Sequence, residues 1–337
     1  MNKEIGISLI LLLAPLMLLA QVSGRYNFDF VDVAGNARVA ALGGHNISLV
    51  SEDVNLFFGN PALINQEMMG SIGLNHAWLM ADIGMSSVAY ATEVKNGMWA
   101  AGLQYLNYGS IPGYDENGMT TGNFQAREYV VALGRSHAIG PYRLGVNLKY
   151  AGSAIGGYNA GMLLFDLGGL YTSPSGNFTA GLLLNNYGFL INEYTGVSNT
   201  RLPLDVKAGI TVKPEHMPAR FSVTLYNLAR ATSVDKKNSN NDVNGVVNKL
   251  MSHMTLGTEI LISKNFNLRA GYNHLINQEL SLENASGGAG FSFGFMLKIK
   301  GFELAYTRSI YHLSGGINYL TLNTNLNFFK KRISKES

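Results

Sequence analysis

Histidine and the carboxylate residues carry most acid–base and metal chemistry in proteins, yet they form no known motif of that kind in this sequence. None of the histidines belongs to a His-x-x-x-His or His-Glu-x-x-His pair. They stand at His45, His76, His137, His216, His253, His274 and His312. The chain has no cysteine, which excludes a disulfide, a cysteine-ligated metal and a lipoprotein anchor. We therefore expect no enzyme, no metal site and no cofactor.

The segment GYDENG at residues 113–118 contains acidic residues and glycine in an order that superficially suggests a calcium loop. It lacks the ligand spacing and the closing glutamate of an EF-hand. A polar surface turn is the better interpretation.

Charged residues within predicted strands are the other place where chemistry could occur. Four of them, and Arg269 nearby, fall on the polar side of those strands: Glu128, Lys149, Lys207 and Glu303. Ionisable residues at membrane depth usually pair with one another or line water. They could form an ion or solute path, or a network that holds a plug in place. We favour the network, because a plug needs polar anchors.

The elements that would position these residues are long strands of alternating polarity. In FSFGFMLKIKGFELAYTR, residues 291–308, phenylalanine and leucine keep to one parity on both sides of a Lys-Ile-Lys-Gly turn. Such alternation predicts a hairpin with one apolar face. The same pattern predicts strands at residues 70–79, 82–93, 98–109, 127–138, 142–155, 158–172, 177–189, 202–214, 219–230, 253–263, 265–275, 288–299, 302–313 and 317–329.

The connections between these strands alternate between short and long. The long ones, at residues 110–126, 190–201, 231–252 and 276–287, all lie at one end, which is typical of outer-membrane barrels with extracellular loops. Charged residues make up only 14% of the chain, against about 25% in soluble domains. We therefore expect an all-β fold, a transmembrane antiparallel β-barrel of about 14 strands over residues 70–330, with its apolar face toward lipid. A soluble two-sheet sandwich is the alternative.

The first residues have the features of a secretion signal. Lys3 precedes an apolar run from Ile5 to Leu19, and small residues follow, so residues 1–24 are predicted to be a signal peptide. An N-terminal membrane anchor is the alternative, but the run is short and Pro15 interrupts it. An even strand count would leave both termini periplasmic, including a tail at residues 331–337. The net charge of +3 gives no reason to expect nucleic-acid binding.

Residues 25–69 do not alternate in polarity, and we expect them to form a hatch inside the barrel. A barrel of this size is wider than the eight-stranded kind that its own side chains can fill. Gly43 and Gly44 would allow close backbone approach, and Asp53 could cap a short turn. Arg38 and Asp53 would then pair with lumen charges such as Glu303 or Lys149. A periplasmic extension is the alternative.

Two stretches in this segment carry a resemblance. NARVAALGG at residues 36–44, followed by DVNLFFGNPAL at residues 53–63, resembles the N-terminal signature of the PorV/PorQ family of type IX secretion proteins. GLQYLNYG at residues 102–109 and GVNLKY at residues 145–150 are most similar to PorQ-type members. That family is similar in turn to the fourteen-stranded fatty-acid transporter FadL, whose hatch also contains an Asn-Pro-Ala element. Here the element is Asn60, Pro61 and Ala62.

The resemblance covers essentially the whole mature chain and implies a function. It implies a non-enzymatic outer-membrane component of the machinery that exports proteins and attaches them to the cell surface in the Bacteroidota. Its partners would be other type IX secretion and attachment proteins, docked through extracellular loops, together with outer-membrane lipid. A FadL-like outer-membrane channel for hydrophobic compounds is the alternative.

The loop at residues 231–252 contains a candidate docking element. Its apolar residues follow helical spacing and predict one stripe on a short helix, with Asn241 or Asp242 as its cap. The stripe consists of Val243, Val246, Val247, Leu250 and Met251. It could pack onto the barrel rim or contact a partner.

Overall fold

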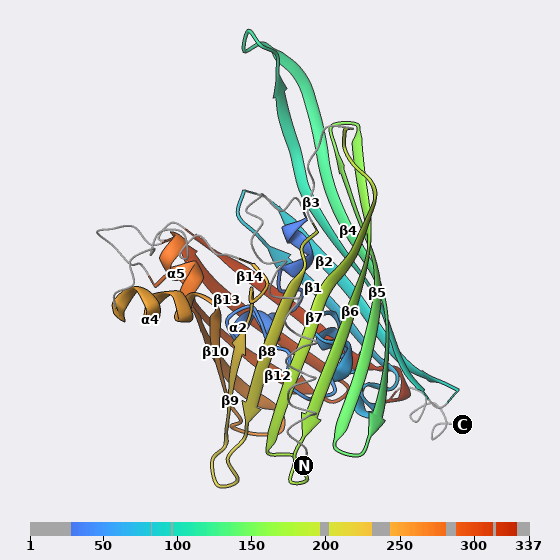
Figure 1. The fold of residues 1–337 in the computed structure, drawn as a ribbon, viewed down its shortest axis with the longest axis vertical. Coiled ribbons are helices and arrows are strands. Elements are labelled where there is room, and N and C mark those ends of the chain that lie inside the picture. The colour runs from blue at the N-terminus through green and yellow to red at the C-terminus, as the bar shows by residue number, and fades with distance from the viewer. Residues whose placement is uncertain are drawn as a thin grey trace, which may run out of the picture.

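In the computed structural model, the described residues form a closed barrel of fourteen antiparallel strands (Figure 1). The structure describes residues 28–81, 83–95, 97–195, 202–230, 243–280, 288–312 and 315–328. Strands that follow one another in the sequence are neighbours in the barrel, and β1 pairs with β14 to close the ring. The predicted barrel is therefore confirmed, and the soluble sandwich was wrong. The predicted signal peptide and the tail at residues 331–337 lie outside the described residues.

The strand bounds are β1 (Ser71–Trp78), β2 (Gly84–Val94), β3 (Gly97–Tyr114), β4 (Thr120–Ile139), β5 (Tyr142–Ile155), β6 (Tyr158–Thr172), β7 (Phe178–Asn192), β8 (Asp205–Val212), β9 (Ala219–Leu225), β10 (Met254–Ile260), β11 (Phe266–Asn273), β12 (Phe291–Ile299), β13 (Phe302–His312) and β14 (Gly315–Asn325). None of the helices in the described part of the chain is long and apolar enough to span a membrane.

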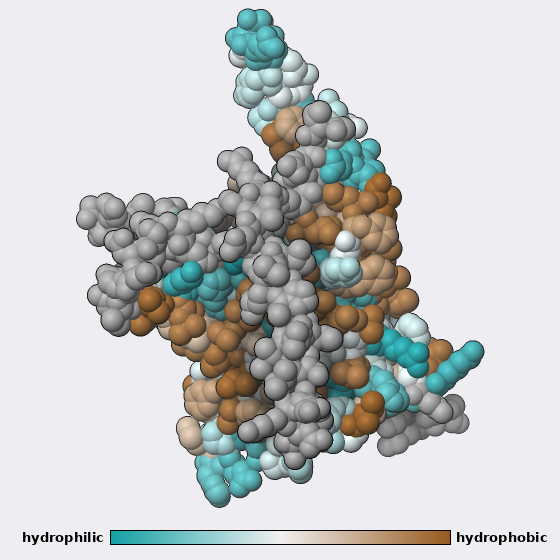
Figure 2. Space-filling model, viewed as in Figure 1, coloured by the Kyte–Doolittle hydropathy of each residue, from teal (hydrophilic) through white to brown (hydrophobic). Residues whose placement is uncertain are grey.

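Alternation along the strands points the apolar side chains outward. On β12, Phe291, Phe293 and Phe295 are exposed on the outer wall, while Ser292 between them is buried on the lumen side. Figure 2 shows hydrophobic side chains over much of the visible outer wall. Because this surface would be unfavourable in water, it is the face that contacts lipid.

The two ends of the barrel differ. We call the end with the connections after β2, β4, β6, β8, β10 and β12 the short-turn end, and the other the long-loop end. The helices α4 (Val243–Ser252) and α5 (His274–Leu280) lie at the long-loop end, and the β3–β4 hairpin rises beyond the rest of the barrel there (Figure 1).

The β3–β4 connection corrects one sequence-based expectation. Residues 110–126 were expected to be a loop, but the two strands stay paired as far as Tyr114 and Thr120. The turn is closed by Asp115, whose Oδ1 accepts hydrogen bonds from the backbone N–H groups of Asn117 at 2.9 Å and Met119 at 2.8 Å. Backbone pairing needs no apolar alternation, so the polar sequence concealed this part of the hairpin.

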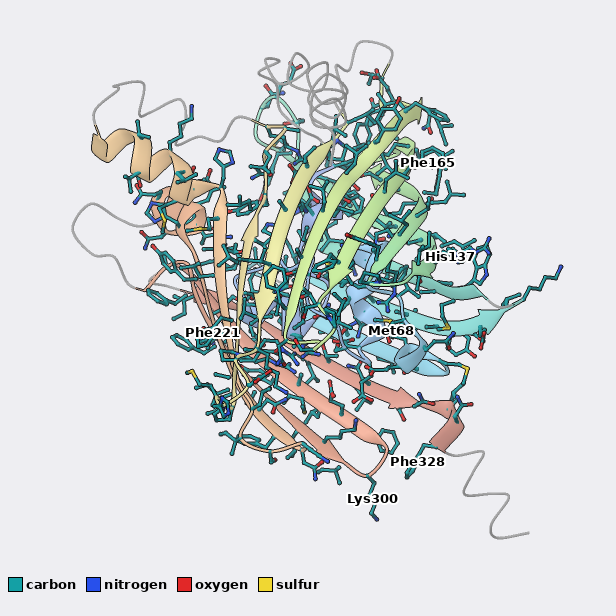
Figure 3. All side chains as sticks on the ribbon, turned by 60° about the horizontal axis from the view of Figure 1, so that its bottom comes forward. Met68, His137, Phe165, Phe221, Lys300 and Phe328 are labelled. Carbon is teal, nitrogen blue, oxygen red and sulfur yellow. The ribbon has the colours of Figure 1, made fainter. Side chains whose placement is uncertain are left out.

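The segment before β1 lies inside the barrel as a hatch. It contains η1 (Asp29–Asp32), α2 (Ala37–Ala41), η2 (Val54–Phe58), η3 (Pro61–Leu63) and η4 (Gln66–Met68). Phe57, Leu63 and Met68 are fully buried, and wall residues such as Ala91, Ala100 and Ala132 pack with them. In Figure 3, Met68 lies among the hatch elements, whereas Phe221 points away from the barrel. The periplasmic extension is therefore ruled out for these residues.

Candidate functional site in the barrel lumen

Wall glycines let the hatch backbone approach the strands. A Cβ atom at Gly145 on β5 would overlap the backbone of Pro61 and Ala62. A Cβ atom at Gly168 on β6 would overlap the side-chain oxygen of Asn60. The hatch therefore fits the wall only because these inward positions carry no side chain.

The Asn-Pro-Ala element is a tightly hydrogen-bonded turn. Asn60 caps η3 by accepting a hydrogen bond from the backbone N–H of Ala62 at 2.9 Å, and it donates to the carbonyl of Ile47 at 2.8 Å. Pro61 occupies the first position of η3, where no N–H is needed. Within the hatch, this element locks two segments of the chain together.

The other predicted hatch residues have separate roles. Gly43 and Gly44 follow α2 with φ angles of +91° and +93°, which side chains disfavour. Asp53 caps η2 by accepting from the backbone N–H of Asn55 at 3.0 Å. The side chain of Asn55 also donates to Asn323 on β14 at 2.9 Å. Asp53 therefore reaches the wall through Asn55 and does not form the ion pair we expected.

Arg38 forms an ion pair between the hatch and the wall. Its guanidinium donates to both carboxylate oxygens of Glu259 on β10, at 2.9 and 3.1 Å. Although burial works to lower the pKa of Arg38, the adjacent Glu259 carboxylate raises it above its ordinary value. Of the expected lumen partners, Glu303 does not pair with Arg38, which binds Glu259, and Lys149 pairs with Asp166 of the wall.

Glu259 also binds two arginines of the wall. Arg220 on β9 lies 2.8 Å from it and Arg269 on β11 lies 3.0 Å from it. Sequence reasoning missed Glu259, although a signal existed. Both arginines are its direct cross-strand neighbours, and all three residues share the inward parity.

Lys149 and Lys207 belong to a second polar network near the middle of β5–β8. Lys149 pairs with Asp166 at 2.8 Å, and Lys207 pairs with Asp32 of the hatch at 3.1 Å. Asn185 joins the two pairs by accepting from Lys149 at 3.3 Å and donating to Asp32 at 2.9 Å. Neither acidic partner was predicted from the sequence.

This network surrounds an irregularity that we call the β7–β8 seam, formed by residues 185–186 and 203–205. Asn185 and Asn186 bulge opposite Asp166, and Asn186 has a φ of +58°. Pairing between β7 and β8 ends at Asn185 and Asp205, and beyond it the side chain of Asn186 donates to the carbonyl of Pro203 at 3.2 Å. At this level polar side chains, not a strand ladder, seal the wall.

The remaining predicted lumen charges lie apart from these networks. Glu128 accepts from the hydroxyls of Tyr108 at 2.6 Å and Ser153 at 3.0 Å. Glu303 accepts from Asn323 at 3.3 Å and lines, with Asp53, a cavity of about 190 Å³ near the short-turn end. Of the four predicted charges, Lys207 pairs with the hatch at Asp32, and the contacts described above for the other three are with wall residues. The charges therefore do not form one continuous row.

Apolar side chains fill the lumen toward the long-loop end. Phe28 and Phe30 of the hatch pack there with wall residues, and their ring centroids lie 5.8 Å apart. The wall contributes Met85, Leu106, Val130, Met162 and Leu164. We call this region, with the two phenylalanines, the apolar chamber.

Among the described residues, a small polar cavity lies between the chamber and the part of the hatch nearer the short-turn end. It has a volume of about 50 Å³, and Asp32, His45, Gln104 and Lys207 are among its lining residues. Burial, together with the nearby Lys207 charge, lowers the pKa of His45 to about 3, so its imidazole is neutral. It stacks on Tyr226 with a centroid distance of 4.2 Å.

Nothing in the described residues resembles a catalytic centre or metal site. The described part of the chain contains no group of three histidine and carboxylate side chains that could hold a metal ion. The Gly-x-Ser-x-Gly spelling at residues 290–294, which sequence reasoning overlooked, runs into strand β12 and is not a strand–turn–helix elbow. Its Ser292 donates to Ser309 at 2.9 Å.

The predicted docking residues lie away from the lumen. Val246, Val247 and Leu250 are exposed on α4, and Met251 is half-buried. The side chain of Val243 lies outside the described residues.

The fold is similar to solved structures of hydrocarbon channels. The Pseudomonas putida toluene transporter TodX matches with a TM-score of 0.53 and 13% identity, over 88% of this chain and 99% of that one. The deltaS2 variant of the TodX monoaromatic hydrocarbon channel matches with a TM-score of 0.55 and 14% identity, over 87% and 97%. No family model and no curated protein matches the sequence. At this identity the likeness establishes the fold alone.

Proposed function

We propose that this chain is an outer-membrane channel for hydrophobic compounds, with its long-loop end at the cell surface. The observation that carries the proposal is the apolar chamber at the long-loop end of the lumen. Concave sites lined by apolar side chains with a few polar groups are typical of binding sites for small hydrophobic ligands. The shared fold with a protein described as a toluene transporter supports the same substrate class.

In this proposal the structure is a closed state. Phe28 and Phe30 occupy the apolar surface that a hydrocarbon would contact. The cavity of about 50 Å³ below them is smaller than the roughly 150 Å³ that accommodates benzene in an engineered protein core. Passage therefore requires residues 28–36 to move away from the chamber.

The β7–β8 seam is where such movement would have the largest effect. Asp32 holds residues 28–36 against the seam through Lys207 at 3.1 Å and Arg230 at 2.8 Å. When this segment moves, Asn185, Lys207 and Arg230 lose a shared partner. The seam and the hatch would therefore open together, because one carboxylate joins them.

Uptake of radiolabelled toluene tests the proposal in a Gram-negative host that lacks a hydrocarbon channel of its own. We expect cells that express the chain to take up toluene faster than cells with an empty vector. The Phe28→Ala, Phe30→Ala double variant should change the initial rate, since it enlarges the chamber. The matched control is Phe178→Ala, which removes an exposed phenylalanine on the outer wall. Uptake equal to the empty vector at equal barrel levels would refute the channel.

A second candidate function is a docking component of the type IX secretion and attachment machinery. It is favoured by the sequence resemblance in the hatch and by the β3–β4 hairpin, whose tip carries the exposed side chains Tyr114 and Met119. Affinity purification in a mild detergent separates the two candidates. Secretion and attachment proteins that co-purify, and are lost when residues 112–122 are replaced by a short turn, would favour docking. Bound hydrophobic compounds without such proteins would favour transport.

A further inference from the structure

Helix α4 has its polar and apolar faces reversed relative to a helix packed on a protein. Among its described side chains, Ser252 is the buried one, and Asn248 hydrogen-bonds to His274 of α5. Val246, Val247 and Leu250 point away from the protein, with exposed fractions of 58%, 53% and 62%. A surface helix normally buries its apolar stripe against the core. Among the residues that the structure describes, none covers the stripe of α4.

The helix is fixed in this orientation by the wall. Residue His253 connects α4 to β10, and its carbonyl accepts a hydrogen bond from the backbone N–H of Tyr226 at 2.9 Å. Its imidazole also hydrogen-bonds to the carbonyl of Tyr226 at 3.1 Å. Two strand ends thus hold the C-terminus of α4, so the helix cannot simply roll to bury its stripe.

The position of α4 identifies what covers it. In Figures 1 and 3 the helix projects to the side of the barrel beyond the ends of β9 and β10, and does not lie over the mouth. Two residues after Ser252, Met254 begins the outward row of β10, which continues with the exposed residues Leu256 and Ile260. Figure 2 shows hydrophobic side chains at the edge that carries α4 and below it over β9 and β10. The exposed stripe is therefore continuous with the lipid-contacting surface of the barrel.

We propose that α4 is an interfacial helix, whose stripe of Val246, Val247 and Leu250 inserts into the lipid leaflet at the long-loop end. A helix with a polar face toward the protein and an apolar face toward acyl chains satisfies both solvents at once. The helix would fix the depth of this side of the barrel, where β8, β9 and β10 are short.

Depth-dependent quenching tests this proposal on the full chain, which has no cysteine of its own. Val247→Cys and Leu250→Cys would carry an NBD fluorophore in phosphatidylcholine–phosphatidylglycerol vesicles, with either doxyl-labelled lipid or aqueous iodide as the quencher. Leu182→Cys, exposed on the outer wall of β7, is the lipid control, and Asn117→Cys, in the β3–β4 turn, is the water control.

We expect doxyl quenching at positions 247 and 250 to lie within about a factor of two of that at position 182, with iodide quenching about fivefold below that at position 117. Accessibility to iodide like that at position 117, in vesicles that hold only this protein, would overturn the proposal and leave the stripe for a protein partner. Protection from both quenchers would also overturn it, because another part of the chain would then cover the stripe. Because two exposed positions are labelled in separate variants, the test does not depend on the correct folding of either single variant.

Discussion

Replacing Arg38 by glutamine should loosen the hatch without unfolding the barrel. Arg38 donates to both oxygens of Glu259, and the two side chains are only 8% and 1% exposed. Breaking a buried ion pair costs roughly 3–5 kcal/mol, chiefly because it leaves the other charge buried without its partner. Here Glu259 keeps Arg220 and Arg269, so we expect the lower end, about 3 kcal/mol.

A loss of about 3 kcal/mol corresponds to roughly a hundredfold change in an equilibrium constant. We therefore expect the fraction of time that the lumen conducts, measured in planar bilayers, to rise by about two orders of magnitude. Strand content and heat-modifiable migration in gels should stay as in the parent, because the pairing of the fourteen strands does not involve Arg38.

The matched control is Arg127→Gln, which removes an exposed arginine on the outer wall. Its conductance should equal that of the parent. If Arg38→Gln also conducts like the parent, Arg38 does not hold the hatch. If it loses the barrel, the ion pair stabilises the wall and not the hatch alone. Either result would refute the reasoning.

Four further outcomes are expected. Gly168→Ala should displace the Asn60 turn and lower the midpoint of thermal unfolding in detergent. Gly169→Ala should leave that midpoint unchanged, because this adjacent position points outward and has no neighbour closer than 4.0 Å. Equal midpoints for the two variants would argue against close packing of the hatch. Asp166→Asn should lower the free energy of unfolding in denaturant by about 3 kcal/mol, because Lys149 stays buried without its partner. The double variant Lys149→Met, Asp166→Leu should recover most of that stability. An Asp166→Asn variant as stable as the parent would contradict this role of the ion pair. Deletion of residues 30–64 should leave an inserted barrel that conducts steadily in planar bilayers, and a large steady conductance of the intact protein would show that the hatch is not a plug. In intact cells, a membrane-impermeant thiol reagent should label Asn117→Cys but not Ser175→Cys, and the reverse would overturn the proposed orientation.

The fourteen strands and their outward face were predictable because strand polarity is local. Alternation with a period of two can be read from a few consecutive residues, as at Phe291, Phe293 and Phe295. Once the barrel is recognised, it follows that the apolar face points outward to lipid. The hatch was predictable for the converse reason. Residues 25–69 break the alternation, and a wide lumen needs a filler. The helical spacing of Val246, Val247 and Leu250 was equally visible in the sequence.

The tertiary structure alone decided which of these residues meet. Arg38 and Glu259 are separated by 221 positions, and only the closed ring and the path of the hatch bring them together. The bulge at Asn186, which no local pattern predicts, brings this residue into hydrogen bonds with both Lys149 and Asp166. For α4 the sequence defined an apolar stripe but not its direction. That direction was set by Asn248, Ser252 and Tyr226, whose contacts with α5 and the wall orient the helix, and such contacts exist only once distant strands have paired.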